Sequence, residues 1–112
     1  MEIVVEHRAQ ACVVRIIGNV DGLTADTLLS ELQARVGEGH VRLVGDLSAM
    51  KYTSSAGLRA LLAVLRDARS GGGDLRLAAV PAPVLKILEL SGFTSILKVF
   101  GDIDGAVASY SA

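Results

Sequence analysis

The sequence predicts an α/β fold built on a small, mixed and mostly parallel sheet of about five strands with about four helices. One observation is that short segments rich in Val and Ile alternate, from the second strand onward, with segments of helical apolar spacing. Another is composition: 51% of the residues are hydrophobic and 4% aromatic, which indicates an aliphatic interior. A length of 112 residues suits one domain over residues 1–112.

The first half of the chain predicts a hairpin followed by a helix. Residues 3–6 and 12–17 are the two strands of the hairpin, and Asp21 and Gly22 make a turn after it. Thr24 can then cap a helix that ends near the following glycines. The apolar residues of this helix share one face: Ala25, Leu28, Leu29, Leu32 and Val36.

A third strand is expected over residues 41–47, followed by a serine-rich turn and a second helix that ends near Arg69. The glycine run at 70–74 is a loop, and residues 75–80 form a fourth strand. Pro83 is suited to the first position of a third helix, which Gly92 ends.

Residues 96–100 predict a fifth strand, and Asp102 can cap a short helix at the end of the chain. The apolar residues of that helix are Ile103, Ala106, Val107 and Tyr110. Because about eight residues are too few for an isolated helix, it must dock on the body of the domain.

The serine-rich turn is the first candidate site. Thr53, Ser54 and Ser55 precede a helix whose leucines recur at the spacing of one buried side, namely Leu58, Leu61, Leu62 and Leu65. Hydroxyls at a helix N-terminus lie where free N–H groups and the helix dipole favour an anion such as phosphate. The same hydroxyls would also serve as ordinary helix caps, and spacing alone does not choose between these functions.

Three motifs carry a resemblance that covers nearly the whole chain. They are D-L-S-A-M-K-Y-T-S-S-A-G-L at 46–58, G-N-V-D at 18–21 and V-L-K-I-L-E-L-S-G-F at 84–93. Together they resemble STAS domains, specifically single-domain anti-sigma factor antagonists, and the resemblance implies the same small mixed sheet backed by helices. The alignment makes Ser55 the phosphorylated residue. This chain has Ser54 where many family members carry Asp, and Ala56 where they carry a second serine.

The resemblance also implies a mechanism called partner switching. The unphosphorylated form binds an anti-sigma factor that is a serine kinase of the GHKL type and thereby releases a sigma factor. Phosphorylation at Ser55 inactivates it, and a serine phosphatase of the PPM type resets the cycle. The chain itself would be neither an enzyme nor a cofactor-binding protein. The partner-binding residues expected on this basis are Asp21, Thr53, Ser54, Ala56, Gly57, Arg59, Ala60 and Ala63.

Three of those residues, Ala56, Ala60 and Ala63, are predicted to lie on an exposed side of the second helix, where small side chains let a partner approach closely. An alternative function within the same family is that of a docking subunit, without phosphorylation, in a lipid-transport ABC complex or a signalling scaffold. An enzyme would need a site that the sequence does not offer, since the turn lacks the G-x-S-x-G nucleophile motif.

Charge and composition argue against several other classes. With a net charge of −1, the chain has no excess of basic residues that would attract nucleic acid or an anionic membrane. The start of the chain lacks a signal-peptide pattern, so we expect a cytoplasmic protein, either a monomer or a weak dimer. Cys12 is expected in the core, while His7 and His40 are predicted to be surface strand residues with no metal-binding role.

Overall fold

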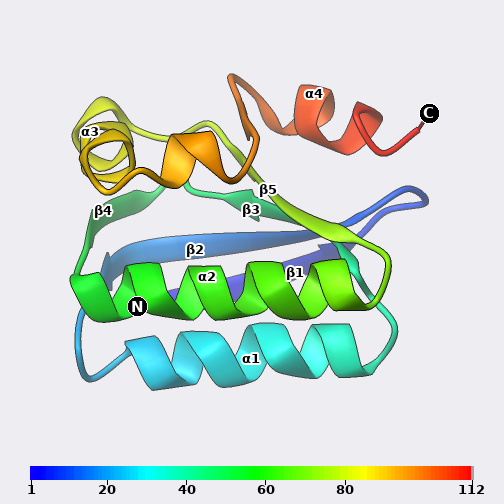
Figure 1. Ribbon diagram of the computed structural model, residues 1–112, viewed down its shortest axis with the longest axis horizontal. Helices are drawn as coiled ribbons and strands as arrows, with labels where there is room; N and C mark the ends of the chain where they lie inside the picture. Colours follow the sequence, from blue (N-terminus) through cyan, green and yellow to red (C-terminus); the bar gives the residue numbers. More distant parts are fainter. Residues whose placement is uncertain (112) are drawn as a thin grey trace.

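The computed structural model describes residues 1–111, in which an α/β sheet is covered by helices on both faces (Figure 1). Its strands are β1 (Glu2–His7), β2 (Cys12–Val20), β3 (Arg42–Asp46), β4 (Met50–Thr53), β5 (Asp74–Ala78) and β6 (Val99–Phe100). Its helices are α1 (Ala25–Gly37), α2 (Ser55–Ser70), α3 (Ala82–Leu90) and α4 (Ile103–Ala108), with a short 3-10 turn at Phe93–Ser95.

The sheet is mixed, as the sequence predicts. Strands β1 and β2 form an antiparallel hairpin, and the order continues through β3, β5 and β6 with parallel pairing. Strand β4 lies outside this path and pairs in parallel with the last residues of β2. The predicted fold class is therefore confirmed. The carboxyl ends of the parallel strands lie at the edge of the sheet where α2 begins.

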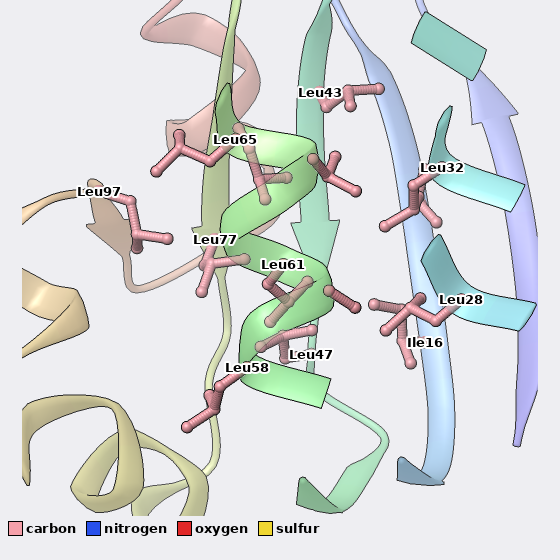
Figure 2. Close-up of a cluster of buried hydrophobic side chains, with 14 of the residues drawn as sticks. Ile16, Leu28, Leu32, Leu43, Leu47, Leu58, Leu61, Leu65, Leu77 and Leu97 are labelled. Atoms are coloured by element: carbon pink, nitrogen blue, oxygen red, sulfur yellow. The ribbon is translucent and has the colours of Figure 1, made fainter. Parts of the chain in front are cut away.

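The larger core lies between the sheet and the helices α1 and α2. Leu61 of α2 lies at the centre of the view, with Leu77 and Leu47 around it, while Leu28 and Leu32 of α1 face β2, Leu28 beside Ile16 (Figure 2). Leu61 and Leu65 are almost completely buried, and Leu62 is half-buried. The predicted inward side of α2 is thus confirmed, with Leu62 at its edge.

The opposite face of the sheet has a smaller apolar cluster beneath α4. Its buried residues are Ala11, Val13, Val44, Ala78, Ala106 and Val107. The Asp102 side chain accepts a hydrogen bond from the Gly105 N–H at 2.7 Å, so this predicted cap is confirmed. The Tyr110 hydroxyl lies 2.7 Å from the Leu43 carbonyl oxygen and 2.9 Å from that of Asp74. The short helix therefore docks on the body, as its length requires.

Two predicted strand assignments need correction. The turn predicted between β3 and α2 contains a further strand, β4, which only the end of β2 pairs with. The predicted strand at 96–100 is reduced to Val99–Phe100, because a 3-10 turn precedes it and the Arg69 guanidinium donates to the Ile96 carbonyl at 2.7 Å. Within residues 1–111, no helix combines the length and the apolar character that crossing a bilayer requires.

Candidate functional site

The serine turn is held between the ends of two paired strands. Thr53 ends β4 opposite Val20 of β2, and the Ser54 N–H donates to the Val20 carbonyl at 2.8 Å. Ser54 has an extended backbone and its Oγ accepts a hydrogen bond from the Gly57 N–H at 3.2 Å, so it is the N-cap of α2. Ser55 is the first helical residue and its side chain is exposed. The two serines therefore have different environments: Ser54 caps the helix and Ser55 faces solvent.

Gly57 lets the start of α2 lie directly against the sheet. A Cβ atom at this position would overlap Thr53 Oγ1 and would lie 2.8 Å from Val20 Cγ1. Real side-chain atoms do not approach so closely, so a larger residue would push the first turn of the helix outward. The position of Ser55 relative to the sheet thus depends on the absence of a side chain two residues later.

Asp21 organises the loop that leads from β2 into α1. Its carboxylate accepts hydrogen bonds from the N–H groups of Thr24 and Leu23, both at 2.9 Å, and from the Thr24 hydroxyl at 3.1 Å. These donors, the Thr24 N–H first, hold the pKa of the Asp21 carboxyl below its ordinary value. Thr24 is the N-cap residue of α1, as predicted, but its side chain makes no capping hydrogen bond, because its hydroxyl oxygen accepts from the Asp21 N–H at 2.9 Å instead.

Predicted partner-binding residues differ widely in exposure. Asp21 and Arg59 are exposed, and Ser54, Ala56 and Ala63 are half-buried. Ala60 is 4% exposed, so the prediction that it lies on an open helix side is wrong. The reason is that α1 packs along this side of α2, and a small residue lets the two helices approach closely.

Two further residues in the predicted set are also buried. Thr53 is 3% exposed, and its hydroxyl donates to the Ser54 carbonyl at 3.2 Å. Gly57 is buried against the end of β2. Both residues position the turn, and neither offers side-chain surface to a partner.

The structure adds surface features that the sequence did not single out. Leu23 is 90% exposed on the loop that Asp21 fixes, and Tyr52 of β4 is 50% exposed. A cavity of about 220 Å³ opens between the first turns of α1 and α2, lined by Ala25, Asp26, Leu29, Ala56, Arg59 and Ala60. In the sequence, the one sign that Leu23 is exposed was its position directly after the turn at Asp21 and Gly22. The cavity depends on how two helices pack, which no local pattern shows.

The chain as a whole has relatives among known proteins. The model of the STAS domain matches residues 2–106. The chain belongs to the STAS domain family. BtrV of Bordetella bronchiseptica, which its name assigns to the anti-sigma factor antagonists, is 39% identical over 93 residues, which are 83% of this chain and 80% of BtrV.

Solved structures of anti-sigma factor antagonists share the fold over nearly the full chain. The structure of TM1081 from Thermotoga maritima, likewise titled as an anti-sigma factor antagonist, has a TM-score of 0.93 at 16% identity and covers 98% of this chain and 95% of its own. The anti-sigma factor antagonist SpoIIAA in its unphosphorylated form has a TM-score of 0.76 at 13% identity, covering 98% of this chain and 97% of its own. At these identities the likeness concerns the fold.

Proposed function

We propose that this STAS protein is an anti-sigma factor antagonist of a partner-switching system. In its unphosphorylated form it binds an anti-sigma factor that is a serine kinase of the GHKL type, and a sigma factor is released. The kinase phosphorylates Ser55, which ends the interaction, and a PPM-type serine phosphatase restores the binding form. The protein needs no cofactor, because the kinase supplies ATP. The observation that carries the proposal is the exposed Ser55 at the start of α2, in a chain 39% identical to BtrV.

The local electrostatics suit a phosphoserine at this position. Ser55 opens a helix of 16 residues whose first turn has no acidic side chain. A phosphate adds about −1.5 to −2 charges, which the positive end of the helix dipole and its N–H groups stabilise. SpoIIAA, a protein of the same fold, has been solved in a phosphorylated form as well as in an unphosphorylated one.

The docking surface we propose consists of the exposed residues around this turn, with Ser55 at its centre. Asp21 and Leu23 border it on the β2–α1 loop, and Arg59 borders it one helical turn along α2. Ala56 and Ala63 contribute less, because they are half-buried, and Ser54 contributes mainly as the cap. Leu23 is the large apolar side chain of this surface, and burying a leucine is worth about 1.5–3 kcal/mol.

The acceptor residue can be tested with two matched serine variants. Ser55→Ala should abolish phosphorylation by the cognate kinase and leave the melting temperature near that of the wild type. Ser54→Ala should still be phosphorylated at Ser55 but should lose about 0.5–2 kcal/mol of stability, because it removes the cap of α2. Peptide mapping by mass spectrometry and thermal unfolding measure both results. Phosphate mainly on Ser54, with Ser55→Ala still fully modified, would contradict the assignment.

The switch itself is proposed to act on the complex and not on the fold. In a closely packed interface the phosphate dianion loses its water and contacts the partner's carboxylates or apolar groups. This desolvation and repulsion cost several kcal/mol unless a basic group of the partner pairs with the phosphate. A loss of about 4 kcal/mol corresponds to roughly a thousandfold in affinity. Phosphorylated protein should therefore keep its melting temperature and lose affinity for the kinase. A large drop in melting temperature on phosphorylation, or an unchanged affinity for the kinase, would contradict this mechanism.

A pull-down with unmodified protein tests the class of partner. Recovery of an ATP-binding serine kinase supports the proposed function, and Leu23→Ala should weaken that capture by about tenfold or more. Recovery of a membrane transporter, with no phosphate transfer to Ser55, would instead select the alternative of a docking subunit.

A further inference from the structure

The end of the sheet opposite the serine turn brings together two histidines that lie far apart in the sequence. His7 ends β1 and His40 lies in the loop between α1 and β3, so the prediction that both are strand residues is wrong for His40. Their ring centroids are 4.5 Å apart and the ring planes are inclined by 42°. Both line a cavity of about 230 Å³ that is open to solvent. We propose that this pair binds one divalent transition-metal ion of the Ni²⁺ or Cu²⁺ type.

The separation of the rings is compatible with two imidazoles bound to one ion. A metal–nitrogen bond is about 2.0–2.1 Å long, which places the centre of a bound imidazole about 3.2 Å from the ion. Two imidazoles at adjacent corners of a square or an octahedron then have centroids about 4.5 Å apart, whereas a tetrahedral angle gives about 5.2 Å. The observed 4.5 Å equals the separation in the right-angled arrangement that Ni²⁺ and Cu²⁺ prefer. Aromatic rings in simple contact reach the same distance, so the titration below decides between the two.

Water from the cavity, which is open to solvent, would take the remaining coordination positions of a bound ion. Within residues 1–111, no group of three or more His, Cys, Asp or Glu side chains is placed to hold a metal ion. Cys12 lies opposite His7 in the β-hairpin and lines the same cavity, but it is 2% exposed. Because the Cys12 side chain is buried, we assign the ligand role to the two exposed or half-buried histidines alone.

Charged groups around the cavity leave the pair accessible to a cation. The Arg8 guanidinium is neutralised by Glu6 at 2.7 Å and by Asp104 at 3.0 Å, and Arg35 is paired with Glu38 at 2.9 Å. Arg42 is exposed at the rim. A bound ion would fasten the end of the hairpin to the α1–β3 loop, and it would stabilise the fold because it binds only the native arrangement.

Ni²⁺ binding to the tag-free chain, followed by isothermal titration calorimetry, tests the proposal. We expect one ion per chain, a melting temperature that rises with Ni²⁺ and falls again with a chelator, and binding that weakens on acidification from about pH 8 to about pH 6, because protons compete for the imidazole nitrogens. His7→Gln and His40→Gln should each weaken binding at least about tenfold, since losing a direct ligand costs no less than losing a supporting hydrogen bond. Melting curves without metal confirm that both variants fold.

Arg42→Ala is the matched control. It removes a cation from the cavity rim, so Ni²⁺ binding should be unchanged or tighter. Binding of inorganic phosphate instead of Ni²⁺, strengthened by acid and lost in Arg42→Ala, would replace the metal site with an anion site. Wild-type Ni²⁺ affinity in either glutamine variant would also overturn the proposal. Ser55→Ala should bind Ni²⁺ as the wild type does, so this test is independent of the proposed function.

Discussion

The two faces of the sheet are held in different ways. The face beneath α1 and α2 is packed with large aliphatic side chains, among them Leu28, Leu61 and Leu77 (Figure 2). The face beneath α4 has only Ala and Val in its buried cluster, and polar groups complete the attachment there. The helix that carries Ser55 is thus fixed by a large apolar area, whereas the end of the chain is fixed by a smaller apolar cluster, with Phe100, Ile103 and Tyr110 packed at its edge, and by hydrogen bonds.

The polar attachment on the α4 face centres on Arg76 of β5. Its guanidinium donates to the Asp74 carboxylate at 3.0 Å and to the Ser109 hydroxyl at 2.7 Å. It also lies over the Tyr110 ring, 4.0 Å from the ring centroid. Substitutions on the two faces should therefore change stability differently. Beneath α2 the loss of stability should be large and independent of pH. Beneath α4 it should be small and should depend on pH.

The largest expected effect is at Leu61, which is 1% exposed in the centre of the α2 face. Leu61→Ala should lower the free energy of unfolding by about 2–5 kcal/mol, because it leaves a cavity in a close-packed core. Leu62→Ala should cost less, since Leu62 is half-buried at the edge of this face. Arg59→Ala is the exposed control on the same helix. Equal losses in thermal or denaturant unfolding at positions 59 and 61 would contradict the assigned faces.

A second and smaller effect is expected where the α2 face meets the serine turn. Gly57→Ala forces a methyl group against Thr53 and Val20, and overpacking of this kind costs about 1–3 kcal/mol. Ala is otherwise a better helix residue than Gly. A lower free energy of unfolding in the variant would therefore indicate overpacking, and a higher one would indicate the effect of helix propensity. A stabilised variant would show that the helix start can move away from the sheet. Phosphorylation of Ser55 in the same variant would report whether such a movement matters to the kinase.

Much of the fold follows from periodicity in the sequence, because each helix has an apolar side whose spacing is local. The α2 side that carries Leu58, Leu61 and Leu65 is an example, and the capping roles of Ser54 and Asp102 are local too. Strand β4 was missed because it has four residues and only two of them, Met50 and Thr53, are buried. Such a short segment has no alternation from which a strand can be recognised.

The place of the serine turn at the start of α2 was predicted, whereas the exposure of the residues around it was predicted only in part. The motif marks Ser55, yet the burial of Ala60 depends on α1, which packs on α2 from about thirty residues away in the chain. The contact between His7 and His40 depends in the same way on the meeting of β1 with the loop after α1. Contacts between distant segments are set by the tertiary structure, and no local spacing in a single sequence reveals them.

The smallest expected effect is on the α4 face, at Tyr110. Its hydroxyl donates its single proton to one of two carbonyl oxygens, on Leu43 and Asp74, so it joins the end of the chain to β3 and β5. Tyr110→Phe keeps the ring beneath the Arg76 guanidinium and removes only the hydroxyl. The free energy of unfolding at neutral pH should therefore fall by about 0.5–1.5 kcal/mol, the usual net worth of one hydrogen bond.

The same residue gives the α4 face its pH dependence. Burial first, and the Asp74 carboxylate second, raise the pKa of the Tyr110 phenol in the folded chain. An unfolded tyrosine ionises near pH ~10, so the stability that depends on the neutral phenol is complete below that pH and is lost as the pH rises above it. Wild-type protein should thus lose more stability than Tyr110→Phe between about pH 9 and pH 11, and the difference between the two should shrink. Urea unfolding at each pH measures this. Parallel curves for the two proteins would mean that apolar contacts alone hold α4, and the contrast between the two faces would then be one of size and not of kind.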